Sequence, residues 1–180
     1  MKALLDACVL YPTVLREILI GVAGAGLFTP IWSDHILEEW ARATTKLGSG
    51  AEAVARGEIA ALRTAFPKAS VARREGLTSR LWLPDPNDIH VLAAAIAGGA
   101  DVIITFNAED FPRQTLADEG LQRLDPDQLL ISIWQQEPAV VAQCVENVRA
   151  EAERLSGRPQ PLRALLKRAR LPRLGKALSA

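Results

Sequence analysis

Residues 83–107 read LPDPNDIHVLAAAIAGGADVIITFN, and this stretch decides the fold. Its first part predicts a helix over about residues 86–98, which a proline opens and a pair of glycines ends. Its second part predicts a strand over residues 100–105. The apolar residues of that strand continue without alternation, which is typical of a strand buried on both faces. An apolar helix followed by such a strand indicates a parallel sheet.

The same succession of strands and helices precedes this stretch. Residues 3–6 predict a second buried strand, and residues 28–32 and 81–83 are weaker strand candidates. Further helices are expected over about residues 12–24, 33–47 and 51–65. The pattern predicts an α/β fold with a central parallel sheet that helices cover on both sides, and with functional groups at the carboxyl ends of the strands.

From Asp125 onward the pattern becomes entirely helical. Apolar residues recur there at helical spacing in three successive stripes, and the segment Gly157–Pro161 interrupts them. We therefore expect an α/β domain over residues 1–124 and a helical C-terminal extension over residues 125–180.

The composition is that of an ordinary globular protein. The chain has 180 residues, of which 49% are apolar, enough for a sizeable core. With only Cys8 and Cys144, it has neither a metal–thiolate cluster nor a disulfide framework, so we expect a cytoplasmic location. Asp6 interrupts the apolar start of the chain, and we expect neither an export signal nor a membrane span.

A formal net charge of zero hides a basic C-terminal segment. Residues 155–180 carry seven basic side chains and no acidic one, which leaves 14 basic and 21 acidic side chains before them. Such a block fits a polyanionic or acidic partner, but it also fits a solvated helix face packed against the acidic part of the same chain, and both interpretations stay open. The candidate contacts to RNA or to a partner are Arg163, Lys167, Arg168 and Arg170.

Acidic residues stand at two places where the predicted elements begin or end. Asp6 ends the first predicted strand, where a buried carboxylate needs a metal ion, an arginine or a helix N-terminus beside it. Ser33 is a plausible N-cap of the helix that carries Glu38 and Glu39. Glu39 lies next to the apolar face of this helix, whereas Glu38 is expected to face solvent.

Two more polar clusters flank the stretch quoted first. Asp85 is expected to cap the alanine-rich helix, and Asp88 lies in its first turn on the side that faces the sheet. Asn107 and Asp110 follow the buried strand, where they either form a turn or take part in a site. Oxygen donors without thiolates or paired histidines favour Mg²⁺ or Mn²⁺, ions that can activate a phosphodiester toward hydrolysis.

In order and spacing, four segments together resemble the PIN-domain family: Leu5–Pro12, Ile36–Trp40, Pro84–Ala95 and Ile104–Phe111. The resemblance covers about residues 1–124 and is greatest to the VapC-type toxins of bacterial toxin–antitoxin pairs. The ending Arg170–Leu174 also resembles one VapC subgroup, less specifically.

The resemblance implies a PIN-like three-layer α/β/α fold and a ribonuclease that depends on Mg²⁺ or Mn²⁺. It also implies a cognate antitoxin as partner, and PIN-type toxins are often homodimers. It assigns the metal ligands to Asp6, Glu39 and Asp88, and the fourth polar position to Asn107 with Asp110 close behind. Asp85 is then an acidic neighbour of the site, and Glu38 is the alternative to Glu39.

One alternative function stays open, and single sequence features argue against the others. A catalytically weak binding module, whose acids hold an antitoxin or a structural ion, stays open as the alternative. The glycines of residues 21–26 lack the spacing of a phosphate-binding loop, and Cys8 stands where a DxD phosphatase has its second acid. His35 and His90 are expected on helix surfaces or beside the site rather than in a catalytic triad.

Overall fold

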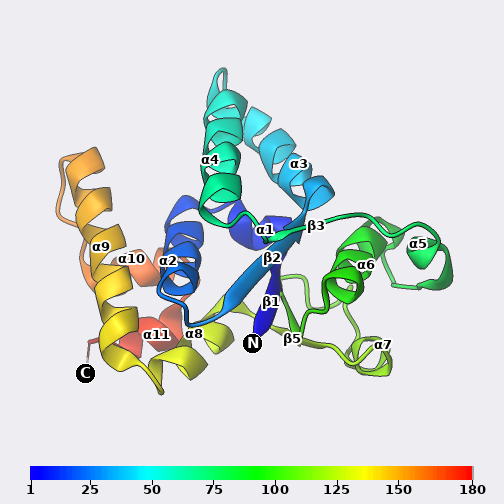
Figure 1. Ribbon diagram of the computed structural model, residues 1–180. Coiled ribbons are helices and arrows are strands. Elements are labelled where there is room, and N and C mark those ends of the chain that lie inside the picture. The colour runs from blue at the N-terminus through cyan, green and yellow to red at the C-terminus, as the bar shows by residue number, and fades with distance from the viewer. Residues whose placement is uncertain (180) are drawn as a thin grey trace. The chain divides into compact units, whose positions relative to one another are not determined.

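The computed structural model of the chain describes residues 1–179 and is drawn in Figure 1. These residues form two compact units, and each is described here by itself. The first contains residues 1–11 and 29–123, and the second contains residues 12–28 and everything from residue 124 onward. The segment 12–28 therefore belongs to the same compact unit as the C-terminal helices. A division of function between residues 1–124 and 125–180 stays a prediction.

A five-stranded sheet in the order β3-β2-β1-β4-β5 is the centre of the first unit, which confirms the predicted α/β class. The pairs β1–β2, β1–β4 and β2–β3 are all parallel. The central strand β1 pairs Leu5 with Ile104 of β4, so the residues after these two strands leave the same edge of the sheet side by side. The strands are β1 (Lys2–Leu5), β2 (Thr29–Ser33), β3 (Ser70–Val71), β4 (Val102–Ile104) and β5 (Gln122–Leu124).

The strand expected over residues 81–83 is wrong. In that segment Leu83 is buried, but Trp82 is 66% exposed, and the segment runs extended toward Asp85 without joining the sheet. The edge strand is instead β3, which pairs with the end of β2 through Ser70 and Val71. A strand of two residues is too short to produce a periodic pattern, which is why the sequence did not indicate it.

Two helical elements of the first unit begin at a residue whose side chain caps them, Ser33 for one and Asp85 for the other. Ser33 accepts a hydrogen bond from the backbone N–H of Ile36 at the start of α3, as expected for an N-cap. Gly98 ends α6 at a close approach to the sheet, because a Cβ atom there would lie 2.6 Å from Cδ1 of Ile31. The helical elements are α1 (Ala7–Leu10), α3 (Asp34–Ala43), the 3₁₀ turn η1 (Thr44–Leu47), α4 (Ala51–Ala65), α5 (Leu77–Arg80), the 3₁₀ turn η2 (Pro86–Asp88), α6 (Ile89–Gly98) and α7 (Arg113–Asp118).

Apart from Leu124, which ends β5, the second unit consists of helices and their connections, and the helices after residue 125 confirm the predicted C-terminal helices. Its helices are α2 (Thr13–Gly24), α8 (Pro126–Trp134), α9 (Pro138–Ser156), α10 (Leu162–Arg168) and α11 (Pro172–Ala177). A capping box between Asp125 and Gln128 opens α8. Asp127 is 5% exposed and accepts hydrogen bonds from the backbone N–H groups of Arg173 and Leu174, so it ties α8 to the start of α11.

Within residues 1–179, no helix combines the length and the apolar composition that crossing a bilayer requires.

Candidate functional site

Asp6 lies at the carboxyl end of the central strand and is held in place by two neighbours. It is 7% exposed, and its Oδ2 accepts hydrogen bonds from the Thr105 hydroxyl at 2.6 Å and from the Cys8 thiol at 3.1 Å. Its backbone N–H bonds to the carbonyl of Ile104, which continues the β1–β4 ladder by one residue. Both bonds to the carboxylate use Oδ2, so Oδ1 is the oxygen that can face a ligand.

Asp88 and Asn107 meet across the same end of the sheet. The Asn107 side-chain amide donates to Oδ2 of Asp88 at 2.9 Å, and the Asn107 backbone N–H donates to the Thr105 hydroxyl at 2.9 Å. Thr105 therefore connects the loop after β4 with Asp6, and Asn107 connects that loop with the start of α6. The structure places Asn107 in direct contact with one of the predicted acids.

Three further carboxylates gather around Asp88. Oxygen atoms of Asp85, Asp88 and Asp110 lie within 4.8 Å of one another. Burial and the negative charges of Asp6, Asp110 and Asp85 raise the pKa of Asp88 from 3.8 to about 6. Because these charges act on Asp88 together, Asp6, Asp85, Asp88 and Asp110 form one electrostatic cluster, called here the acidic site.

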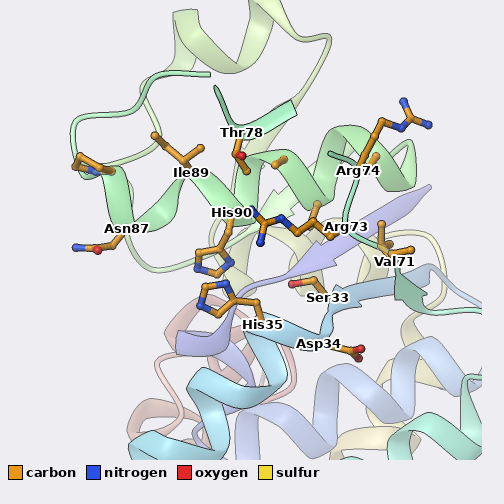
Figure 2. Close-up of a pocket in the computed structure, with 15 residues that line it drawn as sticks. Ser33, Asp34, His35, Val71, Arg73, Arg74, Thr78, Asn87, Ile89 and His90 are labelled. Atoms are coloured by element: carbon orange, nitrogen blue, oxygen red, sulfur yellow. The ribbon is translucent and has the colours of Figure 1, made fainter. Parts of the chain in front are cut away.

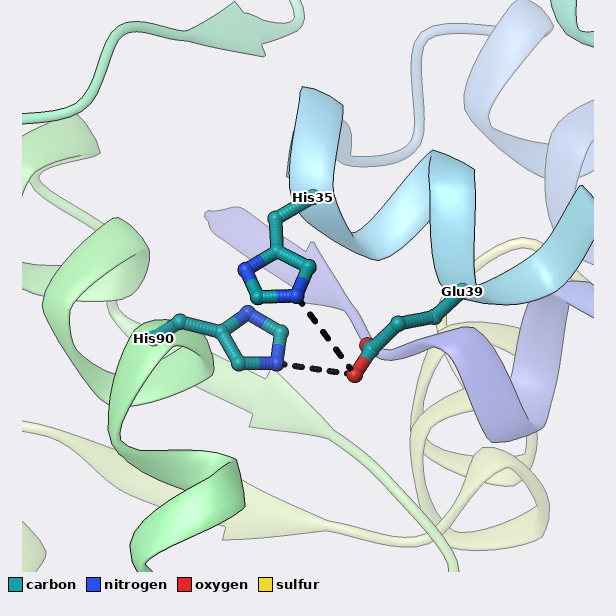
Figure 3. Close-up of side chains that lie close together, drawn as sticks. All are labelled: His35, Glu39 and His90. Atoms are coloured by element: carbon teal, nitrogen blue, oxygen red, sulfur yellow. Dashed lines mark hydrogen bonds and ion pairs between the residues drawn. The ribbon is translucent and has the colours of Figure 1, made fainter. Parts of the chain in front are cut away.

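The two adjacent glutamates of α3 have different surroundings. Glu38 binds Arg42 and Arg56, and these guanidinium groups lower the pKa of its carboxyl to about 2. Glu39 instead lies 3.1 Å from Nε2 of His90, a residue of the first turn of α6 (Figure 3). Glu39 is thus linked to the helix that follows Asp88 through His90 rather than through a carboxylate of the acidic site.

Sequence reasoning missed two residues that organise the site: Cys8 and Thr105. Burial and the charge of Asp6 raise the pKa of the Cys8 thiol to about 12, so it stays protonated and donates to Asp6. The sequence shows Thr105 as a polar residue at the end of an apolar strand, but it does not show which residue its hydroxyl contacts. The hydroxyl meets Asp6 because β1 and β4 end side by side.

A pocket of about 610 Å³ adjoins the site between the start of α3, the segment after β3 and α6 (Figure 2). Its wall combines apolar side chains with the cationic side chains Arg73 and Arg74 and with the rings of His35 and His90. Pro86 and Asn87, which directly precede Asp88, also line it. The pocket therefore brings positive charge and apolar surface next to the acidic site.

The basic candidates of the C-terminal segment belong to the second unit. Arg163 and Lys167 are exposed on α10, and Arg168 donates to the side chain of Gln160. Arg170 is exposed after α10 and has φ +61°. That these four residues contact RNA or a partner stays a prediction.

The donor set of the acidic site fits a hard divalent cation. Carboxylate oxygens that converge at this spacing repel one another, and the raised pKa of Asp88 is one result of that repulsion. A cation among them would relieve the repulsion, and oxygen ligands of this kind suit Mg²⁺ and Mn²⁺.

Because the pKa of Asp88 is raised, the stability of the metal-free protein depends on pH. Between pH 3.8 and about 6 the folded protein keeps a proton that the unfolded chain has released, so the free energy of unfolding falls as pH rises through this window. After allowance for solvent screening of this partly exposed group, we expect a loss of about 1 kcal/mol, or ~2–4 °C in Tm. Asp88→Asn should remove this part of the pH dependence.

Thermal unfolding of both proteins in chelator at about pH 4 and about pH 7 measures this effect. The Tm difference between Asp88→Asn and the wild type should grow in favour of the variant toward the higher pH. An identical pH dependence in the two proteins would contradict the expectation.

Comparison with known families gives one match: residues 2–109 match the family model of the PIN domain. No curated protein and no solved structure matches the chain.

Proposed function

The chain belongs to the PIN-domain family, a nuclease fold, and from that premise we propose that it is a Mg²⁺- or Mn²⁺-dependent endoribonuclease. The observation that carries the proposal is the group of Asp85, Asp88 and Asp110, whose carboxylate oxygens lie within 4.8 Å of one another, with the charge of Asp6 acting on Asp88 and with Asn107 bonded to Asp88.

Asp6, Glu39 and Asp88 are the proposed ligands, and Asn107 and Asp110 the proposed fourth position. A bound divalent cation polarises the phosphodiester and lowers the pKa of a coordinated water. The protein's own part is to hold the ligands at fixed positions. Thr105 and Cys8 orient Asp6, Asn107 orients Asp88, and His90 orients Glu39.

The pocket beside the acidic site supports a nucleic-acid substrate. Arg73 and Arg74 line this pocket and can attract the backbone of a polyanion, and the apolar part of its wall can accept a base. A single-stranded region is the proposed substrate, because its backbone can be splayed to bring one phosphate to the acids.

The biological role we propose is that of a toxin. In this role a cognate antitoxin covers the acidic site, the protein is cytoplasmic, and two copies can associate as a homodimer. These proposals rest on the likeness of residues 1–124 to VapC-type toxins. The basic residues of the second unit, listed above for α10 and after it, are the proposed additional contacts to RNA or to the antitoxin.

Controlled expression in a bacterial host, with transcriptome-wide mapping of RNA 5′ ends, tests the proposal. Wild type and Asp88→Asn are compared at equal soluble abundance, with Asp118→Asn as a control, because Asp118 is an exposed acid on α7 that accepts a hydrogen bond from Gln114 of its own helix. We expect new ends at recurrent sites with the wild type and with the control, and none with Asp88→Asn. Unchanged RNA with all three proteins would favour the binding-module alternative.

A further inference from the structure

Next to the acidic site, a second group of potential metal ligands has a different chemistry. His35, Glu39 and His90 each offer one ligand atom, and these atoms lie within 4.8 Å of one another. Figure 3 shows that both rings turn Nε2 toward Oε1 of Glu39. The two rings are stacked, with centroids 3.8 Å apart and planes inclined by 21°.

The elements around the group hold its members in these positions. His35 and Glu39 are four residues apart in α3 and therefore share one face of that helix. His90 comes from the first turn of α6 and is 15% exposed, so its ring is largely enclosed. His35 is 62% exposed and closes the group on the solvent side.

The spacing of the ligand atoms matches that of a tetrahedral ion. Zinc–ligand bonds of about 2.1 Å require neighbouring ligand atoms about 3.4 Å apart. Nε2 of His90 lies 3.1 Å and Nε2 of His35 lies 4.0 Å from Oε1 of Glu39, so the two distances bracket the required one. Because the two rings are stacked, their Nε2 lone pairs run nearly parallel, and the exposed His35 ring has to turn about its side-chain bonds to direct its Nε2 at a shared ion.

We propose that His35, Glu39 and His90 form a binding site for a transition-metal ion of the zinc class, adjacent to the acidic site. Two imidazole nitrogens and one carboxylate are a ligand set that zinc uses with a fourth position open to water. Mg²⁺ prefers oxygen ligands such as the carboxylates of the acidic site and binds poorly to the nitrogen of an imidazole. The protein thus presents two adjacent cation sites that different ions occupy.

One consequence rests on the proposed function. Glu39 is also one of the ligands proposed for Mg²⁺, so an ion held by the two histidines makes Glu39 unavailable to the Mg²⁺ ion that Asp6 and Asp88 would bind. Zinc-class ions should therefore inhibit Mg²⁺-dependent cleavage, and they should do so less in a protein that lacks His35.

Cobalt binding tests the site without any RNA. Co²⁺ is titrated into the full chain and followed by its visible absorption, and Zn²⁺ is then added to displace it. We expect one tightly bound Co²⁺ with the intense bands of a tetrahedral site, at least tenfold weaker binding in His35→Ala and His90→Ala, and full displacement by Zn²⁺.

Two matched variants make the result specific. Asp34→Asn changes an exposed neighbour of His35 that pairs with Arg63, and it should bind Co²⁺ as the wild type does. Asp88→Asn alters the acidic site and should keep the tetrahedral bands, which separates this proposal from the nuclease proposal. Two results would overturn the proposed His35–Glu39–His90 site. One is that His35→Ala, a change at an exposed residue, binds Co²⁺ as tightly as the wild type. The other is that Asp88→Asn loses the tetrahedral bands.

Cleavage assays then test the consequence. We expect Zn²⁺ to lower Mg²⁺-dependent cleavage by at least about tenfold in the wild type, and by a smaller factor in His35→Ala relative to its own zinc-free rate. Equal inhibition of both proteins would show that zinc acts elsewhere.

Discussion

Replacing Asp6 with asparagine should lower the rate of RNA cleavage by at least about 100-fold while leaving the fold intact. The Oδ2 atom of Asp6 accepts hydrogen bonds from Thr105 and Cys8. An asparagine can place its carbonyl oxygen at that position and keep both bonds. Its amide NH₂ group then faces the acidic site. This group is a hydrogen-bond donor and cannot bind a cation.

Cleavage of a labelled RNA by the purified proteins in Mg²⁺ measures this effect, and circular dichroism and Tm check the fold. Thr105→Val serves as a graded comparison, since it removes one bond that orients Asp6 but keeps the carboxylate. It should lose activity by about tenfold, less than Asp6→Asn. Full activity in a folded Asp6→Asn protein would sink the proposed mechanism.

The largest effect on stability is expected from Asp127→Ala in the helical unit. Asp127 is buried, and its two oxygens accept from the backbone N–H groups of Arg173 at 2.8 Å and Leu174 at 3.0 Å. Alanine leaves these donors at the start of α11 without their acceptors. We expect a loss of about 3 kcal/mol in the free energy of unfolding, or ~6–12 °C in Tm.

Urea unfolding and amide hydrogen exchange measure the loss. Exchange at Leu174 should accelerate in Asp127→Ala, because its N–H loses the carboxylate that protects it. Asp127→Asn keeps one acceptor oxygen and should be intermediate. Asp118→Ala, at an exposed acid, should change stability by less than about 0.5 kcal/mol. If Asp127→Ala matched Asp118→Ala, the bonds between α8 and α11 would contribute nothing.

The candidate site was predictable as far as local sequence reaches. Asp6 and Asn107 stand directly beyond buried strands, and Asp88 stands in the first turn of an apolar helix, so parallel pairing alone is enough to bring them to one edge. The choice between Asn107 and Asp110 was not predictable. The structure bonds Asn107 to Asp88 and also places the Asp110 carboxylate within 4.8 Å of those of Asp85 and Asp88, so both residues lie beside Asp88.

The surroundings of Glu38 and Glu39 show what the local sequence cannot predict. The apolar face of α3 predicted that Glu38 faces solvent and Glu39 does not, but the side chain of Glu38, ion-paired with Arg42 and Arg56, is 35% exposed and that of Glu39 is 39% exposed. What Glu39 meets depends on α6, which lies about fifty residues further along the chain. Helix periodicity defines a face, but only packing defines the partner on that face.

By itself, the sequence determined the α/β class, the central strands and the acids at their ends, because continuous apolar runs and helix caps are local signals. The tertiary structure decided the rest. It decided the short edge strand β3, the pairing of Thr105 with Asp6, and the meeting of His35 and His90 at Glu39. Each of these joins residues that are distant in the sequence, so its energy arises only when separate elements pack, and no pattern within one segment encodes it.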